Sequence, residues 1–339
     1  MRQQAIPLAR TGVLLPFVRF LDDIGAPVER LMESSRLSPQ LLSRPEALFP
    51  LRQGLSFIDR AAHSQGVENL GLVVGQQTRI ADLPDLAQLL SPAMTLYAAL
   101  TLLVRVIALY NSGEKLALTC RGDEAILAHS YRFGDADGRR HGDLFALMLI
   151  IDVIRLAAGT GWRPRAVSLC TSEAGRRRSY ERALQTSVLF AANRWAVYFE
   201  RQLLDEPLHY VRSPRSAATD PLDGLQRAAP ASDFRGSLRQ LILSLLPRGN
   251  PQISVVAAVA GFSTRTLQRR LTEDNLRYSH LLDEARLQAA LDLLRRPEFK
   301  IVDIALELGY SDAANFTRAF RRWTGSSPQA VRRTLIGPT

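Results

Sequence analysis

Side chains suited to reading DNA bases recur at helical spacing in two short segments of the C-terminal third. The six candidates are Arg265, Gln268 and Arg269 in the first segment, and Asn315, Thr317 and Arg318 in the second. An Arg side chain can donate two hydrogen bonds to a guanine edge, and Gln or Asn can pair in the same way with adenine. Residues three or four positions apart share one face of a helix. The two segments therefore predict faces that read bases in the major groove of double-stranded DNA.

The same turn precedes both faces. Gly261–Ser263 reads Gly-Phe-Ser, and Gly309–Ser311 reads Gly-Tyr-Ser. Glycine permits the left-handed backbone of a tight turn between helices, and we expect short support helices at 253–259 and 301–308. Apolar residues at a four-residue interval face inward in the helices after the turns, namely Leu267, Leu271, Phe316 and Phe320. This order predicts two helix-turn-helix units in one chain.

Hydroxyl groups at the helix starts and neighbouring Arg residues are predicted to contact DNA phosphates, which position a protein without specifying sequence. These residues are Ser263, Arg270, Ser311, Arg321 and Arg322. The hydroxyl of Ser263 is also expected to cap the first recognition helix. The aromatic residues Phe320 and Trp323 could stack on bases, but we interpret them as core packing.

A Leu- and Ala-rich segment, Ser279–Arg296, separates the two units and is predicted to be a helix that ends before Pro297. About 18 helical residues at 1.5 Å each span roughly 27 Å. With the widths of the flanking helices added, the two units stand about one DNA turn, or roughly 34 Å, apart. One chain could then enter two successive major grooves.

The charge of the chain favours a polyanionic partner. The net charge is +10 over 339 residues, and 46% of the residues are hydrophobic against 22% charged, which is a globular composition. From Asp233 onward there are 16 Lys and Arg residues against 10 Asp and Glu. Arg suits bidentate contact with phosphate and guanine. A genome that prefers Arg codons is an alternative source of part of this charge.

The first two hundred residues predict an α+β domain, mainly helical with a small antiparallel sheet. Helical apolar periodicity covers 13–24, 51–62, 86–90, 95–110 and 142–158. Alternating runs predict a hairpin of 115–121 and 125–133, and further strands at 166–171 and 195–200. A Pro-, Ala- and Ser-rich stretch follows. We therefore expect a first domain at 1–205, a linker at 206–232, and an all-α domain at 233–335 that begins with a helix capped by Ser232 or Asp233.

Nothing in the sequence predicts an enzyme. It has no glycine-rich phosphate loop, no nucleophile elbow and no helix with metal-ligand spacing, so we expect no catalytic residues, no metal and no cofactor. Cys120 and Cys170 are interpreted as buried inert thiols rather than a disulfide. The N-terminus lacks the apolar core of a signal peptide, and charged residues interrupt the apolar stretches 96–110 and 144–158. A cytoplasmic protein with no membrane span is expected.

The segment Leu308–Arg333 resembles the C-terminal signature of the AraC/XylS family of bacterial transcription regulators. The matching residues are Gly309, Tyr310, Ser311, Asn315, Phe316, Arg318, Phe320, Gly325, Ser327 and Pro328. Ser263–Leu271 and Glu284–Arg286 match the family as well. The resemblance implies a seven-helix DNA-binding domain with two heads, in which the six candidate residues meet bases or nearby phosphates.

The sequence departs from the family pattern at a few positions. Ala313 and Ala314 replace polar residues early in the second recognition helix, so we expect the first head to carry more of the sequence specificity. Asn275 replaces a Gly after the first head, and Asn tolerates the same left-handed backbone. Val331 stands where a Tyr is usual, a small change in packing.

The N-terminal half resembles, over Pro7–Leu31 and Ser187–Leu208, the arabinose-binding-like sensor domain of a subgroup that includes ornithine-utilisation regulators. The resemblance implies an effector-sensing and dimerising role. We therefore expect a sequence-specific transcription regulator, acting as an activator, that a small metabolite controls. RNA polymerase and a second copy of the chain are further expected partners. The sequence singles out no effector-binding residues, and the alternative is an N-terminal module for dimerisation or protein interaction that binds no ligand.

Overall fold

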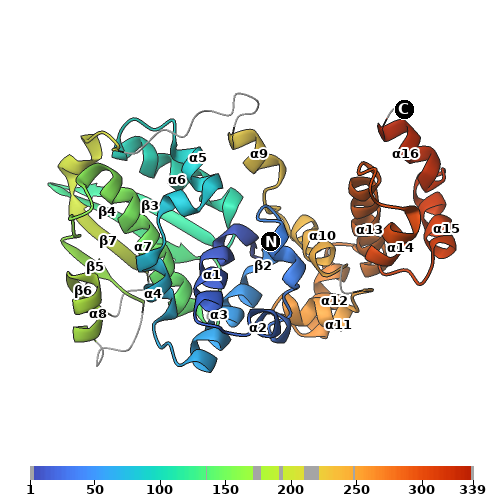
Figure 1. Cartoon of the computed structure of the whole chain (residues 1–339), viewed down its shortest axis with the longest axis horizontal. Coiled ribbons are helices and arrows are strands. Elements are labelled where there is room, and N and C mark those ends of the chain that lie inside the picture. The colour runs from blue at the N-terminus through green and yellow to red at the C-terminus, as the bar shows by residue number, and fades with distance from the viewer. Residues whose placement is uncertain are drawn as a thin grey trace. The chain divides into compact units, whose positions relative to one another are not determined.

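The structure is a computed structural model that describes residues 4–134, 136–170, 177–190, 194–209, 221–246 and 249–336. Its contacts divide the chain into two compact units. The N-terminal unit comprises Ala9–Glu46 and Leu51–Pro230, and the C-terminal unit comprises Met1–Leu8, Ala47–Pro50 and Ala231–Thr339. Each unit is described by itself below (Figure 1). The domain limits expected from the sequence stay a prediction, but the contacts place two N-terminal segments with the C-terminal unit.

The N-terminal unit is mainly helical. Its helices are α1 (Leu15–Asp23), α2 (Val28–Ser34), α3 (Leu51–Gln65), α4 (Leu70–Gln77), α5 (Pro84–Leu90), α6 (Leu96–Tyr110), α7 (Arg139–Ala158), α8 (Arg177–Leu184) and α9 (Pro221–Arg227). Five strands form its sheet: β3 (Glu114–Arg121), β4 (Glu124–Tyr131), β5 (Ala166–Ser168), β6 (Ser187–Leu189) and β7 (Trp195–Glu200). This confirms the expected α+β class.

The sheet has the strand order β3-β4-β7-β5-β6. Its pairs are antiparallel except β5–β6, which is parallel. The predicted hairpin is present as β3 and β4, where Arg121 pairs with Glu124 across a turn at Gly122, whose φ is +59°. Glycine adopts this left-handed conformation without steric cost, which is why the hairpin turns here.

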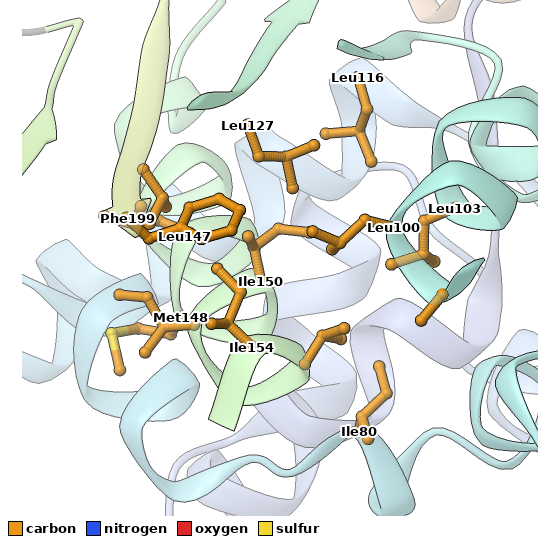
Figure 2. Close-up of a cluster of buried hydrophobic side chains, with 14 of the residues drawn as sticks. Ile80, Leu100, Leu103, Leu116, Leu127, Leu147, Met148, Ile150, Ile154 and Phe199 are labelled. Atoms are coloured by element: carbon orange, nitrogen blue, oxygen red, sulfur yellow. The ribbon is translucent and has the colours of Figure 1, made fainter. Parts of the chain in front are cut away.

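The core of the N-terminal unit lies between the sheet and helices α6 and α7. Figure 2 shows side chains of this core that converge from those elements: Leu100 and Leu103 of α6, Leu147, Ile150 and Ile154 of α7, Leu116 of β3, Leu127 of β4 and Phe199 of β7. Helix α6 begins at a cap in which Oγ1 of Thr95 accepts from the backbone N–H of Ala98. Helix α7 ends at Gly159, as its sequence predicts.

Some details of the N-terminal unit differ from the sequence-based expectation. Cys120, near the end of the edge strand β3, is exposed, and Cys170 is half-buried. The interpretation of both thiols as buried is therefore wrong, and neither forms a disulfide. The expected linker contains α9, whose Leu225 is buried, while residues 210–220 lie outside the described residues.

Helices form the bulk of the C-terminal unit. They are α10 (Phe234–Leu245), α11 (Ile253–Val259), α12 (Thr264–Glu273), α13 (Tyr278–Leu294), α14 (Ile301–Glu307), α15 (Ala313–Thr324) and α16 (Pro328–Ile336). Asp233, one of the two expected caps, begins α10 by accepting from the backbone N–H of Gly236 (2.7 Å). The apolar stripe of α10 is buried in a core shared with α11–α15.

Residues from the beginning of the chain complete that core. Ile6 and Leu8 are 2% and 0% exposed and belong to the same buried cluster as Leu238 and Ile242 of α10. The backbone N–H of Ile6 donates to Oγ of Ser237 (2.9 Å). The short strands β1 (Leu8–Arg10) and β2 (Leu48–Pro50) form a two-stranded sheet. Among the described residues, no helix combines the length and the apolar character that a membrane crossing requires.

Candidate nucleic-acid interface

The first helix-turn-helix unit consists of α11, a turn at Gly261 and α12. Gly261 has a φ of +78°, so the chain turns there through a left-handed residue. Oγ of Ser263 accepts from the backbone N–H of Thr266 (3.1 Å), which caps α12 as its sequence predicts. Leu267 and Leu271 are buried and fix the inner face of α12 against the core. The opposite face is thereby presented to solvent.

That outer face carries the three residues predicted to read bases. Arg265, Gln268 and Arg269 are all exposed. Nε of Arg269 lies 3.5 Å from Oε1 of Glu273 one turn along the helix, and both side chains are more than half exposed. Water screens such a pair strongly, so the guanidinium of Arg269 can exchange it for a DNA contact at little cost. The helix therefore presents two guanidiniums and a carboxamide side by side.

Arg270 is placed differently from its neighbours. Its guanidinium carbon lies 4.3 Å from the ring centroid of Phe262 and 5.7 Å from that of Phe234. These cation–π contacts join α12 to the turn before it and to α10. Arg270 is half-buried, and its contact with a phosphate stays a prediction.

The second unit consists of α14, a turn at Gly309 and α15. Gly309 has a φ of +77°, and the carboxylate of Asp312 caps α15 by accepting from the backbone N–H of Asn315 (2.7 Å). Phe316 and Phe320 are both fully buried, which confirms that Phe320 packs in the core. Trp323 is half-buried, with its ring centroid 6.4 Å from that of Phe320.

The N-terminus of α15 carries a network that α12 lacks. Nδ2 of Asn315 donates to Oγ of Ser311 (3.2 Å) and to Asp312, and Arg318 donates to Oδ1 of Asn315. The backbone N–H of Asn315 holds the pKa of Asp312 below its usual value, so this carboxylate is charged. A negative charge at a helix start offsets the positive end of the helix dipole. The second head therefore offers phosphates a less positive helix start than the first, which Ser263 caps.

Among the other predicted residues of the second head, Arg318, Arg321 and Arg322 are exposed and Thr317 is half-buried. Nη2 of Arg322 lies 3.0 Å from Oδ2 of Asp283 on α13. The side chain of Arg322 is 68% exposed, so water screens this pair and Arg322, like Arg269, can exchange it for a DNA contact. The DNA contacts of all eleven predicted residues stay predictions.

Helix α13 fixes both heads within the C-terminal unit. The hydroxyl of Tyr278 donates to the carbonyl oxygen of Pro251, just before α11. Nε of Arg286 donates to the carbonyl oxygen of Leu308 (3.3 Å), and its guanidinium carbon lies 4.7 Å from the ring centroid of Tyr310. Arg286 is 8% exposed. Its role in holding the second turn was not evident from the sequence, where Glu284–Arg286 was only a family match.

In the C-terminal unit, the two recognition helices α12 and α15 each bury one face in the core and expose the other. The 17 residues of α13 span about 26 Å at 1.5 Å per residue. Among the described residues no group of His, Cys, Asp and Glu side chains is placed to hold a metal ion. The exposed groups on α12 and α15 are hydrogen-bond donors and acceptors and cations. The surface is suited to binding an anionic polymer whose bases it can contact.

Comparison with known protein families gives two matches. Residues 25–208 match the arabinose-binding domain of AraC transcription regulators, and residues 256–334 match a helix-turn-helix domain. The first match covers more than half of the chain. The second includes both recognition helices.

Two curated relatives align along nearly the whole chain. The chain is 24% identical over 332 residues to the HTH-type transcriptional regulator VirS of Mycobacterium tuberculosis, covering 96% of each protein. It is 24% identical over 345 residues to the ornithine utilization regulator of Pseudomonas aeruginosa, covering 97% of this chain and 96% of the relative. Among solved structures, the transcriptional regulator CdpR of Pseudomonas aeruginosa aligns with a TM-score of 0.41 at 22% identity, covering 91% of this chain and 96% of that one.

Proposed function

The chain belongs to the AraC family of helix-turn-helix transcription regulators, in the subgroup with an arabinose-binding-like N-terminal domain, and from this premise we propose that it is a sequence-specific activator controlled by a small metabolite. As a DNA-binding regulator it is not an enzyme. We further propose that it acts in the cytoplasm, contacts RNA polymerase and forms homodimers.

One observation gives the main support for sequence-specific binding. The exposed face of α12 combines Arg265, Gln268 and Arg269, while Leu267 and Leu271 hold its other face in the core. A rigid helix that presents Arg and Gln together can discriminate guanine and adenine edges. The network around Asp312 supports the expectation that the second head reads less sequence than the first. We propose that Ser263, Arg270, Ser311, Arg321 and Arg322 contact phosphates.

A binding experiment tests the assignment of base-reading residues. The chain would first select preferred sites from a library of random duplexes, and fluorescence anisotropy would then measure affinity for the selected site and for its single-base variants. Arg269→Ala and Gln268→Ala should each weaken binding to the selected site by about 1–3 kcal/mol and relax preference at one base pair. Arg19→Ala is the control for Arg269→Ala, because Arg19 is an exposed cation on α1 and its loss changes the net charge by the same amount.

Equal weakening on selected and random DNA by both variants would assign the two residues to phosphate contact instead. Ligand control has its own test. A metabolite that shifts the affinity of the full chain for its selected site supports control by an effector. If no member of a broad metabolite panel changes that affinity or the melting temperature, the N-terminal unit is better described as a dimerisation or protein-interaction module.

A further inference from the structure

A small pocket opens on the N-terminal unit between α4, α7 and α8. Its volume is about 230 Å³, below the range of roughly 300–1,000 Å³ that is typical for drug-sized ligands. The polar part of its wall consists of Gln76, Arg79, Arg155, Arg163 and Gln185. Three of these are Arg, and none of the lining residues, all of which the structure describes, is Asp or Glu. We call this hollow the arginine pocket.

Among the described residues, the positive charges of these three guanidiniums outnumber the carboxylates that contact them. Nη1 of Arg79 lies 3.1 Å from Oδ1 of Asp152. Arg155, by contrast, donates through Nε to the carbonyl oxygen of Trp162 (3.2 Å), and Arg163 donates through Nε to Oε1 of Gln185 (2.6 Å). Both of these acceptors are neutral. The pocket therefore gathers three positive charges around one carboxylate.

Asp152 cannot serve all three cations. Its Oδ2 already accepts from the backbone N–H of Ile80 (2.7 Å), while its Oδ1 faces Arg79. Burial, and then the neighbouring cations Arg163 and Arg79, lower the pKa of Arg155. Like charges held this close repel one another, and an anion placed among them would relieve that repulsion. The electrostatics of the pocket thus favour an anionic occupant.

The base of the arginine pocket is apolar and fixed. Met148 and Ile151 of α7 and Leu184 of α8 line it, and all three are buried in the core. Helices α4 and α7 pack closely beneath it, since a Cβ at Gly75 would stand 2.7 Å from Cβ of Met148. Nε2 of Gln76 donates to the carbonyl oxygen of Ala183 (2.9 Å) and ties α4 to α8. A ligand there would place a charged group among the Arg residues and an apolar body on α7.

We propose that the arginine pocket binds a small carboxylate with a short apolar chain, and, resting on the proposed control by a metabolite, that it is the effector site. A planar carboxylate matches the fork of donors on a guanidinium and can accept two hydrogen bonds from it. Arg155 is the expected main partner, because its position is half-buried and its Nε donates to a neutral carbonyl oxygen rather than to a carboxylate. The apolar base favours a carboxylate over inorganic phosphate, which has no apolar body to bury.

The test is an equilibrium titration of the full chain at fixed ionic strength. The probes are acetate, butyrate, hexanoate, benzoate, glutarate and inorganic phosphate. Binding of each probe is measured by calorimetry and by the change in melting temperature. We expect saturable binding of a carboxylate with four or more carbons, and Arg155→Gln should weaken it at least about tenfold through loss of a charge-assisted pair. Arg19→Gln, on the exposed face of α1, is the matched control and should bind normally.

A second variant keeps the inference testable if Arg155→Gln folds poorly. Gln185→Glu keeps the size of the side chain and places a carboxylate where Nε of Arg163 now donates to an amide oxygen. This built-in anion should raise the melting temperature of the ligand-free chain and weaken binding of the added carboxylate. Unchanged binding in both variants, or no saturable binding of any probe up to about 10 mM, overturns the inference.

The possible outcomes distinguish a failure of this site from a failure of the proposed control by a metabolite. If inorganic phosphate binds as tightly as the best carboxylate and Arg155→Gln abolishes both, the pocket is a general anion site and the assignment to carboxylates is overturned. If a different metabolite alters DNA affinity equally in wild type and Arg155→Gln, ligand control stands and this location is overturned. If a carboxylate binds the pocket without changing DNA affinity, the binding site stands and its role as effector site is overturned.

Discussion

At the scale of single residues, a group of buried polar side chains lies between the sheet and α7. Nδ1 of His129 lies 3.7 Å from Oδ1 of Asp143, and its Nε2 lies 3.6 Å from Oε2 of Glu114. Nε of Arg139 lies 3.7 Å from Oδ2 of Asp143, and the ring of His129 stacks on Trp195 at 4.7 Å. These separations exceed hydrogen-bond lengths, and among the described residues Nδ1 and Nε2 of His129 have no hydrogen-bond partner. Burial raises the pKa of Asp143 to about 6, and this outweighs the lowering effect of the neighbouring His129 and Arg139.

The raised pKa of Asp143 predicts a pH dependence of stability. The folded chain holds the proton of Asp143 more tightly than the unfolded chain, where the pKa has its usual value of 3.8, so wild type loses stability as pH rises from 3.8 to about 6. Asp143→Asn cannot titrate. The unfolding free energy of wild type minus that of the variant should fall across this window and stay level above it, as measured by urea unfolding at a series of pH values. If this difference in unfolding free energy stayed flat or rose with pH, it would contradict a raised pKa for Asp143.

At the scale of elements, the helices and turns that the sequence predicted are those marked by the periodicity of apolar residues and by glycine. The run from Gly261 to Leu271 predicted both the turn and the buried face of α12 because a left-handed residue and two apolar residues one helical turn apart admit few alternatives. The hairpin at Gly122 was predicted for the same reason. Strand β6, only Ser187–Leu189, is too short to show alternation. Arg270 was interpreted by its charge and Arg286 only as a family match, because the aromatic rings that their guanidiniums contact come from other elements that only the fold brings close.

The turn of the second head meets the first head at Gly309. A Cβ at this position would stand 2.9 Å from both the backbone nitrogen of Asn250 and the carbonyl carbon of Gly249, in the loop before α11. Backbone atoms at that distance cannot yield as a flexible side-chain end can. Gly309 therefore serves two purposes, because it supplies the left-handed turn and also lets two loops approach. This close approach and the hydrogen bond from Arg286 together fix the spacing of the two heads within the C-terminal unit.

Gly309→Ala should cost more stability than Gly325→Ala. Both glycines have left-handed backbones, with φ of +77° and +75°, but a Cβ at Gly325 meets nothing within 4 Å. The left-handed strain of about 1–2 kcal/mol is common to both, so the excess for Gly309→Ala measures the contact with the Gly249–Asn250 loop, and we expect it to be about 1–3 kcal/mol. Urea unfolding of the two variants gives the comparison. Equal losses would show that the loop yields freely and that the contact does not set the spacing.

At the scale of the whole molecule, the DNA-binding unit is not one continuous stretch of chain. The chain passes between the units at 8–9, 46–47, 50–51 and 230–231. Ile6 and Leu8 fill part of the core under α10, and Leu48 packs against the same cluster. Nothing in the periodicity of residues 4–8 predicts this, because so short a segment has no face to recognise. The stability of the DNA-binding unit therefore depends on residues that precede the entire N-terminal unit in sequence.

Ile6→Ala should consequently loosen a helix more than two hundred residues away in sequence. Ile6 is 2% exposed, and truncating a side chain buried to that degree leaves a cavity that costs about 2–5 kcal/mol. The amides of α10, against which Ile6 packs, should then exchange with solvent faster in hydrogen-exchange measurements on the full chain. Ile24→Ala makes the same chemical change at a residue that is 45% exposed, and it should alter exchange in α10 little, since exposed substitutions usually cost under about 0.5 kcal/mol. If α10 were equally protected in both variants, the N-terminal residues would not be part of the DNA-binding core.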